Sequence, residues 1–396
     1  MPIPSPFYEQ TSALCRSHEW RDWAGYLAAV TYDVSHEHEY FAVRNAAALF
    51  DITPLFKYDI TGPDAARLIN RAITRDIDKC ATAQVLYTVW CDDHGKIIDD
   101  GTVQRFAENH FRVTAAEPNF LWFSDCGYGL DVHIEDVTDS IAALSVQGPL
   151  ARRVLTALLP GSGIDKLGFF RIAQTEWSGT PLTITRTGYT GDLGYELWCA
   201  AEAAGRLWEG LMQAGKPFGL LPAGLAALDI ARIEAGLLLA GVDYISSLKA
   251  LTESQKSSPF EAGLGWTVHL HKENFVGKPA LMAEKARGSD WQLVGLEIDW
   301  PSLEKVFYAA DLPPQVTGRA SRSATPIYKN GRQIGQATST TFSPILKKYI
   351  ALASVRHGSS AIGESVDLEV TVEYERTLAR ATVVPLPFYN PPHKRA

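Results

Sequence analysis

The sequence predicts an α+β protein that ends in a β-rich domain. Helical and strand patterns alternate along the first two thirds of the chain, whereas the segments after about residue 290 read as successive strands. With 396 residues, of which 46% are hydrophobic, the chain is long enough to form two or three domains with separate cores.

The amino-terminal part predicts a helix, a strand and a second helix in order. Apolar residues in Ala42–Asp51 have helical spacing, and Lys57–Gly62 alternates like a strand. Ala65–Arg71 follows as a helix, with Asp64 as its candidate N-cap. Three further strands are then predicted: Val85–Cys91, Ile97–Val103 and His110–Ala115.

The central part predicts a second set of alternating elements. Ile141–Pro149 reads as a strand that Gly-Pro stops, and a helix runs through Ala151–Leu155. Two amphipathic helices are expected at Ala203–Ala214 and Pro222–Gly236, the second with Pro in its first turn and Gly near its end. The polar residues 245–258 are expected to form a loop or an insertion.

The carboxyl-terminal part predicts strands almost throughout. Asn330-Gly331 is a strong type I′ hairpin signal, because both turn positions need a positive φ. The candidate strands are Val294–Ile298, Ile327–Thr338, Tyr349–Ala353 and Ser365–Val372. This pattern predicts the β-rich C-terminal domain.

Charge and cysteine content narrow the class of protein. A net charge of -8 argues against a nucleic-acid partner, which would require a basic face. The five cysteines are odd in number and form no CxxC pair, so we expect buried thiols in a reducing, cytoplasmic setting. No apolar stretch reaches the length of a membrane span, so we expect no membrane partner.

The common cofactor and metal motifs are missing from the sequence. There is no G-x-G-x-x-G after a strand and no nucleophile elbow. Two His-x-His pairs, His36-Glu37-His38 and His269-Leu270-His271, each offer two ligands on one face of a strand. Because no third ligand stands at a telling spacing, we expect solvated or core histidines and no metal.

The adjacent carboxylates Asp99-Asp100 interrupt an apolar strand. On a strand, successive side chains point to opposite faces, so one of the two must point inward. An inward carboxylate in a pocket would have a raised pKa and could exchange a proton with a substrate. The alternative is an acidic pair in solvent beside a turn, which is the commoner fate of such residues.

The segment Thr185–Leu197, TRTGYTGDLGYEL, carries three glycines, two tyrosines, two acids and an arginine between two candidate strands. Glu196 either pairs with Arg186 or Arg232, or accepts two hydrogen bonds from a flat donor–donor edge such as that of a pterin. Glycines would let backbone approach such a ring. Tyr87 and Tyr189 would offer aromatic surface to it, unless they are ordinary core or strand-face residues.

These motifs together resemble one family. The sequence resembles the T-protein of the glycine cleavage system and its relatives, the folate-dependent aminomethyltransferase superfamily. The most specific elements are RTGYTG with GYE and ARIEAGL. The matching segments are Val43-Arg44 with Leu49–Asp51, Leu86–Thr88, Ile98–Asp100, Ser145–Pro149, Arg186–Gly191, Gly194–Glu196, Ala231–Leu237, Gly263–Trp266, Val276–Lys278, Thr338–Thr340, Phe342–Pro344 and Ile350–Leu352.

The resemblance implies a three-domain cloverleaf whose central channel holds tetrahydrofolate. Residues 1–55 with about 140–200 would form the folate-binding first domain. Residues about 56–139 with about 201–285 would form the second domain, and 290–396 a barrel-like third.

The resemblance also implies roles for individual residues. Asp100, with Asp99 beside it, would stand near the reacting nitrogens as the catalytic group, and Glu196 would bind the pterin edge. The other residues implied at the cofactor site are Tyr87, Tyr189, Arg232, Trp266, Val113 and Thr114.

The expected function is transfer of a methyl group from a small N-, S- or O-methyl donor to N5 of tetrahydrofolate. Departures from the T-protein pattern favour this reading: ITPL (Ile52–Leu55) replaces a V-S-H continuation, Val242 stands at an Asn position, and Gly101 replaces a Leu. The alternative is an aminomethyltransferase that uses a lipoylated carrier protein. A non-catalytic folate-binding assembly protein is disfavoured by the retained Asp99-Asp100 and Glu196.

Overall fold

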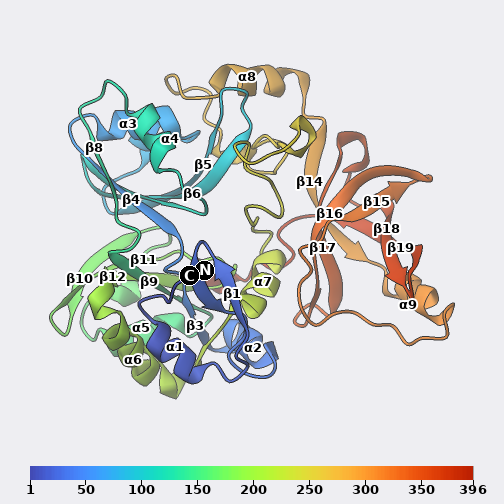
Figure 1. The fold of residues 1–396 in the computed structure, drawn as a ribbon, viewed down its shortest axis with the longest axis horizontal. Coiled ribbons are helices and arrows are strands. Elements are labelled where there is room, and N and C mark those ends of the chain that lie inside the picture. Colours follow the sequence, from blue (N-terminus) through green and yellow to red (C-terminus); the bar gives the residue numbers. More distant parts are fainter. Residues whose placement is uncertain (396) are drawn as a thin grey trace.

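The computed structural model describes residues 1–395 and contains three large β-sheets, each with a hydrophobic core of its own (Figure 1). Two of the sheets lie one above the other, and the third is a closed barrel beside them. No helix in the described part of the chain is both long and apolar enough to cross a membrane. All five cysteines are buried, as expected.

The first sheet has six strands and is assembled from distant parts of the chain. Its order is β10 (Ile172–Trp177), β11 (Thr180–Thr185), β12 (Gly194–Ala200), β9 (Ile141–Gln147), β3 (Ala47–Asp51) and β13 (Leu220–Pro222). Neighbours are antiparallel except β13, which runs parallel to β3. The helices α1 (Tyr8–Leu14), α5 (Ala151–Leu158) and α6 (Ala204–Gly215) pack on it.

The second sheet has five strands and carries the acidic pair. Its order is β5 (Gln84–Cys91), β6 (Ile97–Ala107), β7 (His110–Ala115), β4 (Phe56–Thr61) and β8 (His133–Asp136), all antiparallel. Helices α3 (Ala65–Ala72) and α4 (Phe120–Cys126) cover one face and close its core.

The C-terminal sheet is a closed barrel, which confirms the predicted β-rich domain. Its order is β14 (Trp291–Ile298), β17 (Lys348–Arg356), β16 (Arg332–Ser343), β15 (Thr325–Lys329), β18 (Ser365–Val372) and β19 (Glu375–Val384), with α9 (Trp300–Tyr308) against β19. Asn330 (φ 52°) and Gly331 (φ 72°) both have positive φ, so the predicted type I′ hairpin is confirmed.

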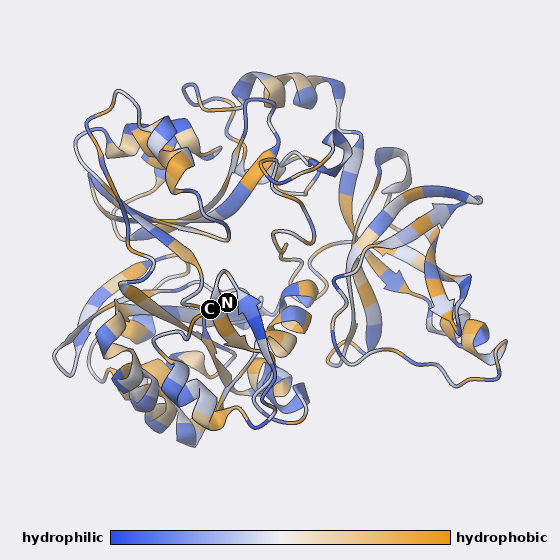
Figure 2. Ribbon diagram, in the orientation of Figure 1, coloured by the Kyte–Doolittle hydropathy of each residue, from blue (hydrophilic) through white to orange (hydrophobic). Residues whose placement is uncertain are grey.

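Helix α7 (Leu225–Glu234) lies between the first sheet and the barrel and contacts α2 (Glu37–Asn45), β16 and β17. Residues 226–234 of α7 are all buried, and its ribbon is mainly apolar in Figure 2.

By contrast, the edge hairpin of β1 (Trp20–Trp23) and β2 (Tyr26–Ala29) has a hydrophilic first strand. Helix α8 (Lys278–Arg287) precedes the barrel.

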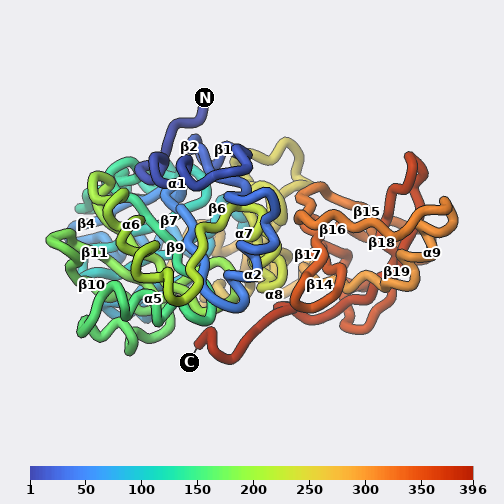
Figure 3. The backbone as a smooth tube through the Cα atoms, turned by 90° about the horizontal axis from the view of Figure 1, so that it is seen from below, coloured from blue at the N-terminus to red at the C-terminus, as the bar shows by residue number. Residues whose placement is uncertain are grey.

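The C-terminal segment returns from the barrel to the first sheet. In Figure 3 it runs along the lower edge of the view, on the side opposite the N-terminus. The backbone N–H of Tyr389 donates to Glu234 O at 2.8 Å, and Nε2 of His393 lies 2.7 Å from Oδ1 of Asp192. The segment therefore holds barrel, α7 and the 185–194 loop together.

Three local predictions were wrong because long-range pairing overrides local pattern. The helix expected over Ala42–Asp51 ends at Asn45, and Ala47–Asp51 pairs with β9 and β13 as β3. The helix expected from Pro222 starts at Leu225, because Pro222 pairs with Leu49. Asp64 precedes α3 without capping it, since its carboxylate accepts the N–H of Asp131 instead.

The division into domains stays a prediction, with one adjustment that the packing requires. Helix α6, which the predicted second domain included, packs on α5 and α1 and shares the core of the six-stranded sheet. Strand β13 also belongs to that sheet. The first domain therefore takes in residues beyond 200.

Candidate functional site

Strand β6 places the two carboxylates on opposite faces of the five-stranded sheet. Asp100 is paired with Val89 and shares its face with Tyr87 and Thr102, because alternate residues on a strand point the same way. Asp99 is paired with Trp90 and points toward the core under α4. The alternation expected from the sequence therefore separates a fully buried carboxylate from a half-buried one on the opposite face of the sheet.

Asp99 is fully buried and anchored by polar donors. Its Oδ2 accepts the backbone N–H of Glu117 and the Nδ2–H of Asn119, both at 2.8 Å. Its Oδ1 accepts the N–H of Asp100 at 2.8 Å and the hydroxyl of Tyr244 at 3.2 Å. Burial, and then the charge of Asp100, raise the pKa of Asp99 well above its usual value.

Asp100 is half-buried and held by two tyrosine hydroxyls. Tyr87 donates to Oδ2 at 2.8 Å, and Tyr244 donates to Oδ1. Burial raises the pKa of Asp100, while these two hydrogen bonds oppose the rise. Because two adjacent carboxylates share one donor in a buried setting, protonation of one affects the other.

Tyr87 extends the site to an aromatic platform. Its ring stacks on that of Trp266, with centroids 5.8 Å apart and planes 24° from parallel. The guanidinium of Arg75 lies 5.5 Å from the Trp266 ring centre. Trp266 is 59% exposed, so one surface of this platform remains available for a flat ligand.

Tyr189 approaches the same carboxylate from the first sheet. Its hydroxyl donates to the carbonyl of Leu238. Burial is the main cause that raises the pKa of Tyr189, and the charge of Asp100 also contributes. Burial is also the main cause that raises the pKa of Tyr87, and the charge of Asp100 and then Tyr189 contribute to the same rise. The fold therefore brings Tyr87, Tyr189 and Asp100 within electrostatic reach of one another.

Glu196 lies on β12 opposite Thr185 and has hydroxyl partners rather than a basic one. Thr187 donates to its Oε2 at 2.6 Å and Thr185 at 3.3 Å, whereas Oε1 accepts no hydrogen bond from residues 1–395. The alternative in which Glu196 pairs with Arg232 is not observed, because Arg232 pairs with Asp243 and Asp229. Burial raises the pKa of Glu196, while the hydrogen bonds from Thr187 and Thr185 lower it.

The glycines of the 185–194 loop serve packing against Gln147. A Cβ on Gly188 would lie 2.1 Å from Oε1 of Gln147, and one on Gly194 would lie 2.2 Å from the same amide. The amide of Gln147 in turn donates to Ser145 and to the carbonyl of Thr187. Gly188 and Gly194 thus let the loop close over a buried side chain, whereas a Cβ on Gly191 would lie 2.5 Å from that of Ala235.

Arg232 lies in an ion-pair network rather than at an open surface. It is 0% exposed, and its guanidinium donates to Asp243, Asp229 and Ser339. The partner hydroxyl belongs to β16, so the network joins α7 to the barrel. Because its donors have protein acceptors, we assign Arg232 a structural role and do not propose it as a ligand.

The two predicted residues of β7 point in different directions. Val113 is fully buried in the core under α3 and α4, so its side chain faces away from Asp100. Thr114 pairs with Thr102, and their hydroxyls are 2.7 Å apart on the face that also carries Tyr87. Of the two, only the Thr114 side chain shares the face of Asp100.

Sequence reasoning missed Tyr244 and Asn119. Tyr244 is buried and its hydroxyl contacts both carboxylates, although it lies 145 residues from Asp99 and 144 from Asp100 in the sequence. Asn119 precedes α4 and orients Asp99. Nothing in the local pattern around either residue signals the contact, because both contacts depend on tertiary structure.

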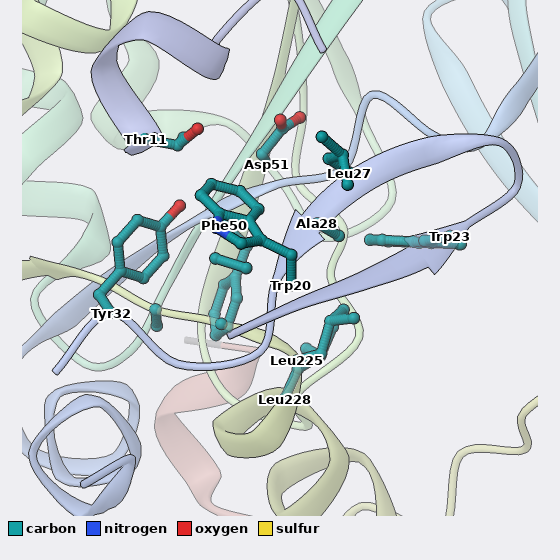
Figure 4. A pocket seen from close by; sticks show the side chains of 13 residues that line it. Thr11, Trp20, Trp23, Leu27, Ala28, Tyr32, Phe50, Asp51, Leu225 and Leu228 are labelled. Carbon is teal, nitrogen blue, oxygen red and sulfur yellow. The ribbon is translucent and has the colours of Figure 1, made fainter. Parts of the chain in front are cut away.

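Two cavities in the structure lie away from these residues. One of about 20 Å³ lies between the β1–β2 hairpin, β3 and α7 (Figure 4), with Trp20, Tyr32 and Asp51 among its lining. It has room for about one water molecule. Another of about 370 Å³ lies in the barrel beside α9. No predicted site residue lines either cavity, so the central channel stays a prediction.

Comparisons with known proteins cover almost the whole chain. The family model described as the GCVT N-terminal domain matches residues 11–272, and that described as the glycine cleavage T-protein C-terminal barrel domain matches residues 313–390. The crystal structure of glycine cleavage system aminomethyltransferase T from Bartonella henselae superposes with a TM-score of 0.83 at 26% identity, covering 98% of this chain and 99% of that chain.

Curated relatives fall under two names. An aminomethyltransferase of Anoxybacillus flavithermus is 35% identical over 376 residues, which is 93% of this chain and 94% of that protein. A trimethylamine-oxide aldolase of Ruegeria pomeroyi is 36% identical over 369 residues, which is 90% of this chain and 43% of that protein. The predicted resemblance and fold class are thereby confirmed.

Proposed function

Since the chain belongs to the family of the glycine cleavage T-protein, we propose that it transfers a one-carbon unit to N5 of tetrahydrofolate. Membership of this family makes the chain an enzyme of the transferase class. The observation that carries the proposal is Asp100, a half-buried carboxylate of β6 that two tyrosine hydroxyls hold in place beside an aromatic platform.

The residues present fit a reduced pterin. Glu196 is a half-buried carboxylate with one oxygen held by hydroxyls and the other without a donor among residues 1–395, which suits the two-donor edge of that ring. Tyr87, Trp266 and Tyr189 would supply aromatic surface. The bound cofactor would contribute a nucleophilic amine nitrogen that takes up the carbon unit.

In this proposal Asp100 stabilises positive charge and transfers a proton at the reacting nitrogens. Its ionised form would stabilise positive charge that develops beside it, and its protonated form would return a proton. Tyr87 and Tyr244 fix its orientation, and Tyr244 also contacts Asp99. Removal of such a group typically costs a factor of about 10² to 10⁴ in rate.

We propose an aminomethyl group as the carbon unit, with a lipoylated carrier protein as its donor. Support comes from curated relatives named aminomethyltransferase, which this chain matches over nearly their full length. The similarity to the aminomethyltransferase T crystal structure, which extends over nearly the whole of both chains, adds to this support. A cytoplasmic location belongs to the same proposal.

A small methylated donor is the second candidate. It is favoured by the relative named trimethylamine-oxide aldolase, which is as similar to this chain as the aminomethyltransferases are. The departures at Ile52–Leu55 and Val242 also favour a changed donor side. Here the product would be 5-methyltetrahydrofolate.

Calorimetric titration with tetrahydrofolate under anaerobic conditions tests the cofactor site. Glu196→Ala is expected to lose measurable affinity, whereas Glu202→Ala, an exposed glutamate just after the same strand, should bind like the wild type. Asp100→Asn should keep its affinity and lose turnover. Equal binding by the Glu196 variant and its control would refute the assignment.

A donor panel distinguishes the two candidate reactions. Protein with tetrahydrofolate is offered an aminomethyl-loaded lipoylated carrier in one series and N-, S- and O-methyl compounds in another. Carrier-dependent release of ammonia supports the aminomethyl reaction, and formation of 5-methyltetrahydrofolate supports the methyl donor. Absence of both products, with folate binding intact, would refute one-carbon transfer from either donor class.

A further inference from the structure

We propose that Asp76, His269 and His271 form a binding site for a divalent transition-metal ion. One ligand atom from each residue can be chosen so that all three lie within 4.8 Å of one another. The sequence predicted no metal here because no third ligand stood near the His-x-His pair. The fold supplies it from almost two hundred residues away, since Asp76 precedes the short turn Ile77–Lys79 beside the second sheet.

The separations suit a small ion. Nε2 of His271 and Oδ2 of Asp76 are 3.6 Å apart. Bonds of about 2.0 Å in tetrahedral geometry place neighbouring ligand atoms about 3.3 Å apart. The two imidazoles stack with centroids 5.3 Å apart, so both rings face the same space. The three ligand atoms therefore need only small side-chain movements to reach one ion.

The protein backbone holds the ligands in register before any ion binds. The N–H of His269 donates to Thr74 O at 3.1 Å. Nδ1 of His269 accepts the N–H of Asp76 at 3.2 Å, a hydrogen bond that is lost when either ring nitrogen coordinates an ion, because coordination through Nε2 places the ring proton on Nδ1. Asp76 is nearly buried, and its Oδ1 accepts the N–H of Asp78, which leaves Oδ2 toward His271. His271 is largely exposed, so the site opens to solvent and an ion can enter.

The ammonium group of Lys79 already lies between two of the proposed ligands, His271 and Asp76. Nζ of Lys79 is 2.7 Å from Nε2 of His271 and 3.7 Å from Oδ2 of Asp76. The Lys79 side chain is 59% exposed, so it can swing into solvent when an ion takes its position. Lys79 therefore acts as a competitor, and its removal should strengthen ion binding.

The donor set selects the class of ion. Two imidazole nitrogens and one carboxylate oxygen suit Zn²⁺, Co²⁺, Ni²⁺ or Cu²⁺ better than Mg²⁺ or Ca²⁺, which prefer oxygen ligands. Three protein ligands leave a coordination position for water. The other His-x-His pair makes no comparable site, because Nε2 of His36 lies 2.6 Å from the carbonyl of Gly318.

Calorimetric titration of the full chain with Zn²⁺, repeated with Co²⁺ by visible absorption, tests the site. We expect one site whose affinity falls at least about tenfold in His271→Ala, since even outer-shell partners of metals are worth about 10- to 100-fold. Lys79→Met should bind more tightly than the wild type, and Mg²⁺ should not compete. His133→Ala, which removes an exposed histidine on β8, is the matched control.

Asp76→Asn should weaken binding like His271→Ala, with thermal unfolding as a check because Asp76 also orients its own turn. His271→Ala keeps the test decisive if the Asp76 variant fails to fold. The proposal is overturned if His271→Ala and His133→Ala bind the ions equally, or if neither the wild type nor Lys79→Met binds them.

Discussion

Replacing Tyr244 by phenylalanine tests whether Asp100 works as an ionised carboxylate. The hydroxyl of Tyr244 donates to Asp100 and lies 3.2 Å from Oδ1 of Asp99. The substitution removes that oxygen and keeps the ring, which is packed among apolar residues. The hydrogen bond from Tyr87 to Asp100, at 2.8 Å, remains.

The size of the effect follows from the lost hydrogen bond. A hydrogen bond to an ionised group contributes about 1.5–3 kcal/mol. At 1.36 kcal/mol per pKa unit, its loss should raise the pKa of Asp100 by about one to two units. Burial has already raised this pKa, and the bond from Tyr244 opposes the rise. The acid limb of the pH–rate profile should therefore move to higher pH by the same amount.

The assay is kcat/KM for one-carbon transfer as a function of pH, which reports groups of the free enzyme. Tyr244→Phe is compared with Tyr26→Phe, in which a tyrosine–aspartate bond of 2.6 Å is lost between Tyr26 and Asp139. Only the first variant should shift the acid limb. A folded Tyr244 variant with normal folate affinity and an unshifted limb would refute the reasoning.

Three further predictions follow from single contacts. Burial raises the pKa of Glu196 above its usual 4.5. Folate affinity should therefore be present above this raised pKa and be lost as the pH falls through it. Calorimetry should find that the Glu196→Gln variant binds folate weakly at every pH. A Cβ on Gly101 would lie 1.8 Å from the Thr114 carbonyl, so Gly101→Ala should lower the free energy of unfolding by about 1–3 kcal/mol in denaturant titrations, whereas Gly358→Ala, which meets no neighbour, should not. Arg232→Met leaves a buried aspartate unpaired and should cost about 3–5 kcal/mol in the same titrations.

Local pattern was sufficient wherever an element forms by short-range contacts. The helix at Ala65–Ala72 and the hairpin turn at Asn330-Gly331 could be predicted, since spacing and positive φ leave few alternatives. Strand β3 could not, because its residues have helical spacing and become a strand only by pairing with β9 and β13. Strand β19 carries exposed charges between its apolar residues and closes the barrel only through β14 and β18.

The candidate site divides in the same way. Alternation along β6 was enough to predict that one carboxylate of the pair points inward, and the structure separates Asp99 from Asp100 accordingly. Arg232 was predicted at the cofactor site only because the family resemblance implies it there. Its acceptors, Asp243 and Ser339, lie on other segments, so sequence reasoning could not see that its donors are used.

The polar segment 245–258, which the sequence left without a role, explains how Tyr244 reaches the acidic pair. The N–H of Ser247 donates to the carbonyl of Ile97 at 2.8 Å, and the N–H of Ile97 donates to Ser257 at 2.9 Å. Both ends of the segment are thus fastened to the first residue of β6, two positions before Asp99. Tyr244 lies three residues before Ser247, so the hydrogen bond between Ser247 and Ile97 positions the Tyr244 hydroxyl at the carboxylates. A polar composition is what such a segment requires, because it gains its position from backbone hydrogen bonds and buries little apolar surface.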